Sequence, residues 1–203
     1  MKLAIFGDPH GDLEAVKAIL HLTRKCDAIW CLGDLVDDGP LSEETALCIA
    51  ALQYPTVRGN HDRWAVNRGC AEANGVRQEL STATLNYLAA LPIGYQATLE
   101  GIRVGMWHAR PRSDFDVLFV DSPVEDLVSA SSKTDAQILL VGHSHTAFRV
   151  TLPDGRLLIS PGAACRERNL CATYGVLELP PRKFTLYDLA SESKMPLKER
   201  ILY

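Results

Sequence analysis

The sequence lacks any stretch that approaches the ~18 apolar residues of a membrane-spanning helix. The apolar run at its start is short, and the acidic residue Asp8 follows at once, which does not fit an export signal. Internal repeats, low-complexity tracts and long blocks of like charge are also missing. We therefore expect a cytoplasmic protein that makes no contact with a membrane.

A basic excess is absent too, because the net charge is -4 with histidine neutral. Stable nucleic-acid binders usually carry a basic excess, so we expect no such partner. Small anionic substrates stay open, since a local metal cluster can outweigh the global charge. The six cysteines include no C-x-x-C pair, and we expect reduced thiols that pack as small hydrophobic groups.

The 203 residues, of which 47% are hydrophobic and 23% charged, have the make-up of one globular domain. A chain of this length buries a core without metal or disulfide staples, so a bound metal would serve chemistry rather than folding. No linker divides the chain. We predict a single domain over residues 1–203, present as a monomer or a homo-oligomer.

Strands and helices are expected to alternate in the first third of the chain, which predicts parallel pairing in an α/β sheet. The expected strands are Lys2–Phe6, Ala28–Leu32 and Pro55–Arg58. The expected helices are Asp12–Arg24 and Ser42–Leu52, the second with Ser42 as its N-cap.

The segment Arg63–Leu91 is expected to be helical in two pieces, broken near Asn74-Gly75, and it could form an insertion, a lid or a dimer surface. After it the chain is β-rich, apart from a short helix at Val124–Ser131. The expected strands are Tyr95–Leu99, Ile102–Trp107, Ile138–Val141, Ala147–Leu152, Arg156–Ser160, Thr173–Glu178 and Lys183–Asp188, the first two forming a hairpin turned at Glu100-Gly101.

Side chains that can bind metals or move protons gather where the predicted strands end. They are Asp8, His10, Asp34, Asn60, His61, His108, His143 and His145. Because ligands bind beyond the carboxyl ends of parallel strands, we expect these side chains to meet at one edge of the sheet. His143 and His145 would share a side if the preceding strand extends that far. The remaining histidine, His21, falls inside a predicted helix and is expected to be structural.

Seven of these side chains are candidate metal ligands: Asp8, His10, Asp34, Asn60, His108, His143 and His145. Each loop by itself would pass for an ordinary turn or a polar strand edge. Together they are too many for one ordinary site, and they suit two ions bridged by one carboxylate. A set of nitrogen and oxygen ligands without thiolate suits Mn, Fe, Zn, Ni or Mg.

Five short blocks, in their order along the chain, resemble the calcineurin-like metallophosphoesterase superfamily. They are Asp-x-His, Gly-Asp-x-x-Asp, Gly-Asn-His-Asp, a lone His and Gly-His-x-His, and they span residues 8 to 145. The resemblance implies a sandwich of two mixed sheets flanked by helices. The α/β pattern read from the sequence agrees with that fold but does not derive it.

The resemblance also implies a role for each position. Asp8, His10 and His145 would bind one divalent ion, Asn60, His108 and His143 the other, and Asp34 would bridge the two. Manganese is the expected metal, with Fe, Zn, Ni or Mg as alternatives. A hydroxide between the ions would attack phosphorus, since two ions lower the pKa of bound water and clamp the phosphoryl oxygens. His61 would protonate the leaving oxygen, and Asp37 would orient His61.

Substrate contacts are expected from Asn60 and from arginines that follow ligand loops. Arg63, Arg110 and Arg112 could grip a phosphate through paired N–H donors, or they could be ordinary surface arginines. For Arg166 and Arg168 we expect no substrate role. Trp64 and Trp107 flank candidate ligands, and we expect both to pack in the core rather than to stack on a nucleobase.

Departures from the family pattern narrow the expected activity. Asp38 stands where the protein-phosphatase branch usually has an arginine, and Gly-Asn-His-Asp replaces Gly-Asn-His-Glu, which argues against protein dephosphorylation. The short chain looks more like the small bacterial and archaeal phosphodiesterases, although Ala109 and Arg110 depart from their His-Gly-Ser-Pro stretch.

We therefore expect a phosphodiesterase that acts on a small or nucleotide substrate. The alternatives are a phosphomonoesterase or dinucleoside-polyphosphate hydrolase with the same dimetal site, and a binding scaffold like the retromer subunit that resembles this family. A nuclease is disfavoured by the acidic charge.

Overall fold

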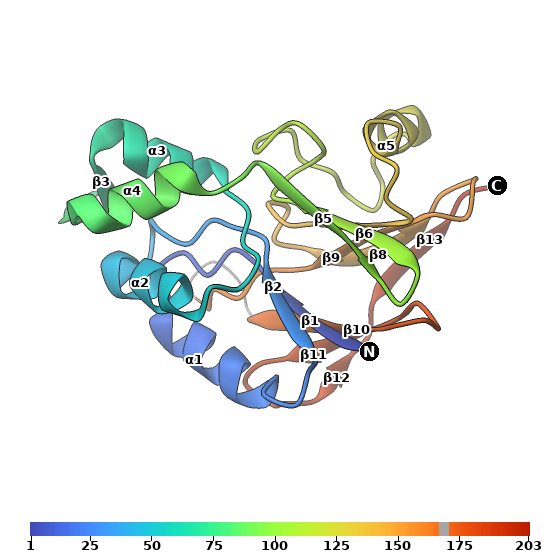
Figure 1. The fold of residues 1–203 in the computed structure, drawn as a ribbon, viewed down its shortest axis with the longest axis horizontal. Helices are drawn as coiled ribbons and strands as arrows, with labels where there is room; N and C mark the ends of the chain where they lie inside the picture. Colours follow the sequence, from blue (N-terminus) through green and yellow to red (C-terminus); the bar gives the residue numbers. More distant parts are fainter. Residues whose placement is uncertain (167–170) are drawn as a thin grey trace.

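The computed structural model describes residues 1–166 and 171–203, and in them two mixed sheets face each other (Figure 1). The first sheet has the order β12-β11-β10-β1-β2. Its strands are β1 (Lys2–Phe6), β2 (Ala28–Cys31), β10 (Thr173–Glu178), β11 (Lys183–Asp188) and β12 (Lys194–Met195). Within it β1 pairs parallel with β2 and antiparallel with β10, so strands from the first and the last third of the chain build this sheet.

The second sheet has the order β13-β8-β9-β7-β6-β5. Its strands are β5 (Gly94–Leu99), β6 (Ile102–Trp107), β7 (Ile138–Val141), β8 (Ala147–Thr151), β9 (Leu157–Pro161) and β13 (Lys198–Ile201). Strands β6, β7 and β9 run parallel at its centre, and the β5–β6 hairpin lies at one edge with the expected turn. The mixed α/β sandwich implied by the family resemblance is therefore confirmed.

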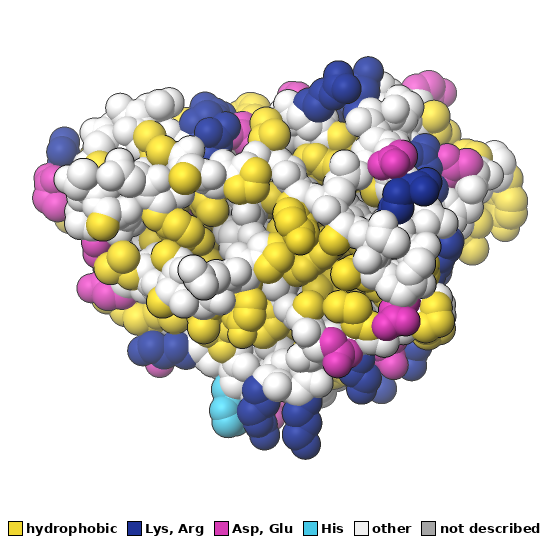
Figure 2. Space-filling model, viewed as in Figure 1, with side chains coloured by type: hydrophobic (Ala, Val, Ile, Leu, Met, Phe, Trp, Pro, Cys, Tyr) yellow, Lys and Arg dark blue, Asp and Glu magenta, His cyan; other side chains and the backbone are white. Residues whose placement is uncertain are grey.

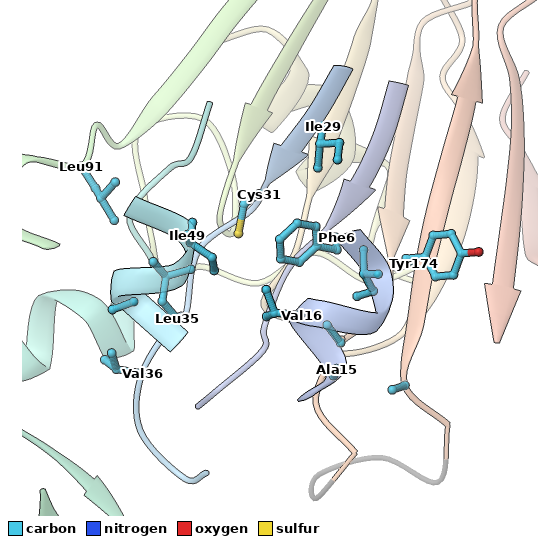
Figure 3. Close-up of a cluster of buried hydrophobic side chains, with 14 of the residues drawn as sticks. Phe6, Ala15, Val16, Ile29, Cys31, Leu35, Val36, Ile49, Leu91 and Tyr174 are labelled. Atoms are coloured by element: carbon cyan, nitrogen blue, oxygen red, sulfur yellow. The ribbon is translucent and has the colours of Figure 1, made fainter. Parts of the chain in front are cut away.

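The helices cover the outer faces of the two sheets. They are α1 (Leu13–Leu22), α2 (Ser42–Leu52), α3 (Asn60–Arg68), α4 (Thr82–Ala90) and α5 (Val124–Ser131). Phe6 of β1 packs with Val16 of α1 and Ile49 of α2 in one buried cluster (Figure 3). Leu127 of α5 packs against the outer side of the second sheet in another. Among the helices of the described residues, none is long and apolar enough to cross a bilayer.

Strand β1 buries side chains on both faces of its sheet. Leu3 and Ile5 point between the sheets, where they meet Met106 and Leu140 of the second sheet. Ala4 and Phe6 point the other way, toward the helices, as the two-residue period of a strand requires. On the surface, hydrophobic side chains extend across the middle of one face (Figure 2).

Three sequence expectations are wrong in the first half of the chain. Pro55–Arg58 makes only one parallel bridge, between Thr56 and Cys31, because Gly59 already leads into α3. Ser42 is the first residue of α2 rather than its cap, and its hydroxyl oxygen instead accepts a hydrogen bond from the backbone N–H of Asp37 at 3.1 Å.

The third error concerns residues 70–79, which form a β-hairpin, β3 (Cys70–Ala73) and β4 (Val76–Glu79), instead of helix. Its turn residues Asn74 and Gly75 have φ values of 51° and 76°. Two successive positive φ angles suit a tight two-residue hairpin turn, for which Asn-Gly is a strong signal. Strands β12 and β13 were not expected. Whether the segment acts as a lid stays a prediction.

We expect Leu140→Ala to lower the free energy of unfolding by about 2–5 kcal/mol, because it opens a cavity between the sheets. Leu140 is fully buried in the inter-sheet cluster. Urea unfolding of the metal-free protein measures the change. Val128→Ala, at a side chain that is 40% exposed on α5, should change it by less than about 0.5 kcal/mol. Equal losses in the two variants would contradict this view of the core.

Candidate metal centre

The seven candidate ligands lie together at one end of the sandwich, beyond the carboxyl ends of strands from both sheets. Asp8 and His10 follow β1, Asp34 follows β2, Asn60 opens α3, His108 follows β6, and His143 and His145 follow β7. Backbone hydrogen bonds join the loops. The N–H of Asp8 donates to Gly33 at 2.9 Å, and the N–H of His10 donates to Asp34 at 3.0 Å.

One group of ligands consists of Asp8, His10 and His145, whose ligand atoms all lie within 4.8 Å of one another. The Nε2 atoms of His10 and His145 are 3.1 Å apart. Nε2 of His145 is 3.5 Å from Oδ1 of Asp8.

A second group surrounds the fully buried His108. Its Nε2 lies 3.0 Å from Oδ1 of Asn60, 3.3 Å from Nδ1 of His143 and 3.2 Å from Oδ2 of Asp34. The Nδ1 atom of His108 lies 2.8 Å from the carbonyl oxygen of Leu32. A ligand-bearing histidine commonly donates its other ring N–H in this way, which fixes the ring and the tautomer.

The carboxylate of Asp34 joins the two groups. Its Oδ2 lies 3.2 Å from Nε2 of His108 and 3.7 Å from Nε2 of His10. Nitrogen and oxygen ligands bind such ions at ~2.0–2.2 Å, so ligand atoms around one ion lie roughly 3.0–3.5 Å apart. The closest spacings in both groups fall in that range, and the chemistry of the donor set therefore fits two divalent cations that share Asp34.

The backbone holds five of these ligands in the left-handed region. Asp8, His10, Asp34, His143 and His145 have φ values of 54°, 45°, 54°, 62° and 52°. Non-glycine residues rarely adopt this conformation, and such residues cluster at functional sites. His143 and His145 were expected to share a side only if the strand reached them; β7 ends at Val141, and the two side chains face different ligand groups.

Asp62 organises the Asp34 loop, a role that sequence reasoning missed. Its buried carboxylate accepts the backbone N–H groups of Asp34 at 3.0 Å, Leu35 at 2.8 Å and Gly59 at 2.8 Å. A Cβ on Gly59 would come within 2.0 Å of Oδ1 of Asp34, so only glycine lets α3 start this close to the carboxylate. The sequence signal for this role is the last residue of the Gly-Asn-His-Asp block, which is Asp62.

The electrostatics of the metal-free cluster favour a proton on His108 and His145 and disfavour one on His143 and Asp34. Burial by itself would lower the pKa of His108, but the Asp34 carboxylate outweighs it and raises that pKa to about 10. Burial would also lower the pKa of His145, but the hydrogen bond to Asp8 and the charge of Asp8 outweigh it and raise that pKa. Burial and the positive charge of His108 lower the pKa of His143. Burial would raise the pKa of Asp34, but His108 and His10 outweigh it and hold that pKa well below the usual range.

His61 lies beside the cluster, half-buried, with the predicted carboxylate against it. Nδ1 of His61 and Oδ2 of Asp37 are 2.9 Å apart, and the Arg68 guanidinium donates to the same oxygen. The N–H of Glu72 donates to the other oxygen of Asp37 at 2.7 Å. Burial would lower the pKa of His61, but its hydrogen bond to Asp37 and the Asp34 charge raise it above the usual value.

The three arginines considered for substrate binding differ in what they contact. The Arg63 guanidinium donates two hydrogen bonds to Asp114, at 2.8 and 2.9 Å. Arg110 donates to the carbonyl oxygens of residues 116 and 117 in its own loop. Arg112 is exposed with a φ of 74°. Arg166 pairs with Asp12, and Arg168 lies outside the described residues.

Aromatic side chains border the cluster. The Trp64 ring centroid lies 4.8 Å from that of His61 and 6.0 Å from that of Phe115. Phe115 is 54% exposed, and its ring lies 5.6 Å from His143. The expectation that Trp64 packs in the core is therefore wrong, because this side chain is only half-buried, whereas Trp107 is buried in a core cluster as expected.

A family model described as a calcineurin-like phosphoesterase superfamily domain matches residues 1–180. A protein of Methanocaldococcus jannaschii named as the uncharacterized protein MJ0912 is 29% identical over 173 residues, which cover 79% of this chain and 68% of that protein. The crystal structure of a metallophosphoesterase from Sphaerobacter thermophilus superimposes with a TM-score of 0.72 at 22% identity. The match covers 93% of this chain and 87% of that one.

A shorter match links the chain to a protein named as a symmetrical bis(5′-nucleosyl)-tetraphosphatase from Psychromonas ingrahamii. The two are 39% identical over 67 residues. Those residues cover 30% of this chain and 24% of the tetraphosphatase, so most of each protein lies outside the match.

We expect the affinity for Mn²⁺ to rise with pH, because protons on the histidines compete with the metal. Below the raised pKa values of His108 and His145, the ion has to displace a proton from the ring in order to bind. For each proton displaced, the Mn²⁺ affinity should rise about tenfold per pH unit. Equilibrium dialysis at pH 6 and pH 8 measures the change.

Two variants control the metal experiment. Asp34→Asn should weaken the binding of both ions, whereas His21→Gln, at an exposed position in α1, should bind as the unmodified protein does. An affinity that is equal at the two pH values, or two ions retained by Asp34→Asn at full affinity, would contradict the shared centre.

Proposed function

The chain belongs to the calcineurin-like phosphoesterase superfamily, and from that premise we propose that it hydrolyses phosphodiesters in small molecules or nucleotides. The observation that carries the proposal is the Asp34 carboxylate, which is within 3.7 Å of a histidine from each ligand group. Asp8, His10 and His145 would hold one ion, and Asn60, His108 and His143 the other. Mn²⁺ is the ion we favour.

Bound divalent ions would activate water and neutralise the charge that develops on the phosphoryl group. Residues of this chain supply the proton for the leaving oxygen and hold the reacting groups in place. His61, whose pKa lies above its usual value, donates a proton to the leaving oxygen. Asp37 accepts the hydrogen bond from Nδ1 of His61, so that Nε2 faces the substrate. Asp62 fixes the loop that carries Asp34.

The main alternative with an observation behind it is cleavage of a dinucleoside polyphosphate, which the partial match to the tetraphosphatase supports. A phosphomonoesterase would use the same ligands. A binding scaffold is disfavoured because each of the seven candidate ligands is present and lies in the cluster.

We expect metal-stripped protein to regain hydrolysis of bis-p-nitrophenyl phosphate when Mn²⁺ is added, at a higher kcat/KM than for p-nitrophenyl phosphate. Asn60→Ala should lower kcat/KM by at least about 100-fold, because it removes a ligand next to His108. Asn86→Ala, at an exposed position in α4, is the matched control. Faster turnover of the monoester would favour the phosphatase alternative, and no turnover with any divalent ion would favour the scaffold.

Asp37→Asn should lower kcat by about tenfold or more and shift its pH profile. A general acid works only while protonated, so the rate falls as the pH rises through the pKa of His61. Loss of the carboxylate lowers that pKa, and the falling limb should therefore move to lower pH. Asp126→Asn, at an exposed position in α5, should leave the profile unchanged. An unshifted limb in Asp37→Asn would rule out His61 as the acid that Asp37 tunes.

A further inference from the structure

A cavity of about 280 Å³ opens beside His61, between α3 and the β3–β4 hairpin, and we refer to it as the hairpin pocket. Trp64 and Arg68 line it from α3, and Glu72 and Asn74 line it from the hairpin. Asp37 and Asp38 complete the wall next to His61. The volume is near the lower end of the range for small-molecule sites, which suits one organic group.

The position of His61 determines which part of a substrate reaches this pocket. A general acid must lie within hydrogen-bond distance of the oxygen that it protonates, so the leaving group has to sit beside His61. Among the described residues that line the pocket, none is one of the seven candidate metal ligands. The phosphoryl group would stay at the ligand cluster, while the leaving alcohol extends into the hairpin pocket.

The charge of the pocket is unsuited to an anionic leaving group. Three carboxylates line it, from Asp37, Asp38 and Glu72, against two cationic groups, the protonated ring of His61 and the guanidinium of Arg68. That guanidinium already binds Asp37 and lies 3.6 Å from Glu72. A phosphate on the leaving group would therefore meet net negative charge. The Trp64 ring offers a flat apolar surface and can attract a cation.

We propose that the hairpin pocket binds the leaving alcohol and selects uncharged or cationic alcohols over phosphorylated ones. The proposal rests on the hydrolase function and narrows its substrates. It favours esters of a nucleoside, an aryl alcohol or an amino alcohol. It disfavours cleavage within a polyphosphate chain, where the leaving group is itself a nucleotide.

Glu72 gives a clean way to change the charge of the pocket. The hairpin contacts Asp37 and Asp38 through the backbone of Glu72, whose N–H donates to Asp37 and whose carbonyl oxygen accepts from Asp38, both at 2.7 Å. Its side chain is 51% exposed, so Glu72→Lys should fold. Glu79 lies in the same hairpin at a side chain that is 77% exposed, and Glu79→Lys makes the same charge change away from the pocket.

The first test measures binding without turnover. Phenyltrimethylammonium and benzenesulfonate are titrated into the Mn²⁺-loaded protein by ligand-observed NMR. The unmodified protein should prefer the cation. Glu72→Lys should reduce the cation-to-anion affinity ratio by about threefold to tenfold, as expected for reversing one charge several ångströms away near water. Glu79→Lys should leave the ratio within about twofold of the unmodified protein. A preference for the anion, or equal effects of the two lysine variants, would overturn the proposal.

The second test measures kcat/KM for methyl aryl phosphodiesters whose phenol carries a sulfonate or a trimethylammonium group. The ratio of Glu72→Lys to the unmodified protein cancels the intrinsic reactivity of each ester, and it should be about threefold to tenfold higher for the sulfonate. Charge-selective binding without turnover of any ester would contradict the hydrolase function and support the charge selectivity of the hairpin pocket. Turnover with no charge selectivity in either test would contradict the proposed role of the hairpin pocket and support the hydrolase function.

Discussion

The buried carboxylate of Asp34 is the interaction on which the rest of the centre depends. Its Oδ1 accepts the N–H of His61 at 2.9 Å, and its Oδ2 faces His10 and His108. A charge fully removed from water is stable only when donors or opposite charges surround it. The histidines and the start of α3 therefore converge on this one group.

That convergence is built from both halves of the sandwich. The first sheet supplies the loops after β1 and β2, and the second supplies those after β6 and β7, so the spacing of the ligands follows from how the two sheets pack. Left-handed backbone at five ligand positions would be costly in isolation. The hydrogen bonds between neighbouring loops, and the three N–H groups that Asp62 accepts, offset this cost.

Much of this arrangement could be predicted from the sequence, because short apolar runs and ligand motifs at their ends are local signals. The β1, β2 and β6 strands and the ligand cluster belong to this group. What could not be predicted depends on contacts between distant segments. The pairing of Arg63 with Asp114 joins residues 51 positions apart, and Trp64 borders the site only because α3 places it beside His61. The Asn74-Gly75 pair is a local signal that fits both a break in a helix and a hairpin turn, and the structure has the hairpin.

The position of β1 in its sheet has a consequence for how the protein is made. This strand carries Asp8 and His10 at its end and lies between β2 and β10 (Figure 1). Lys2 pairs with Glu178, so β1 is synthesised long before the antiparallel neighbour that completes its pairing. Pairing across such a separation is slow, because a long loop must close first. During synthesis the half-paired strand is a segment that chaperones could bind.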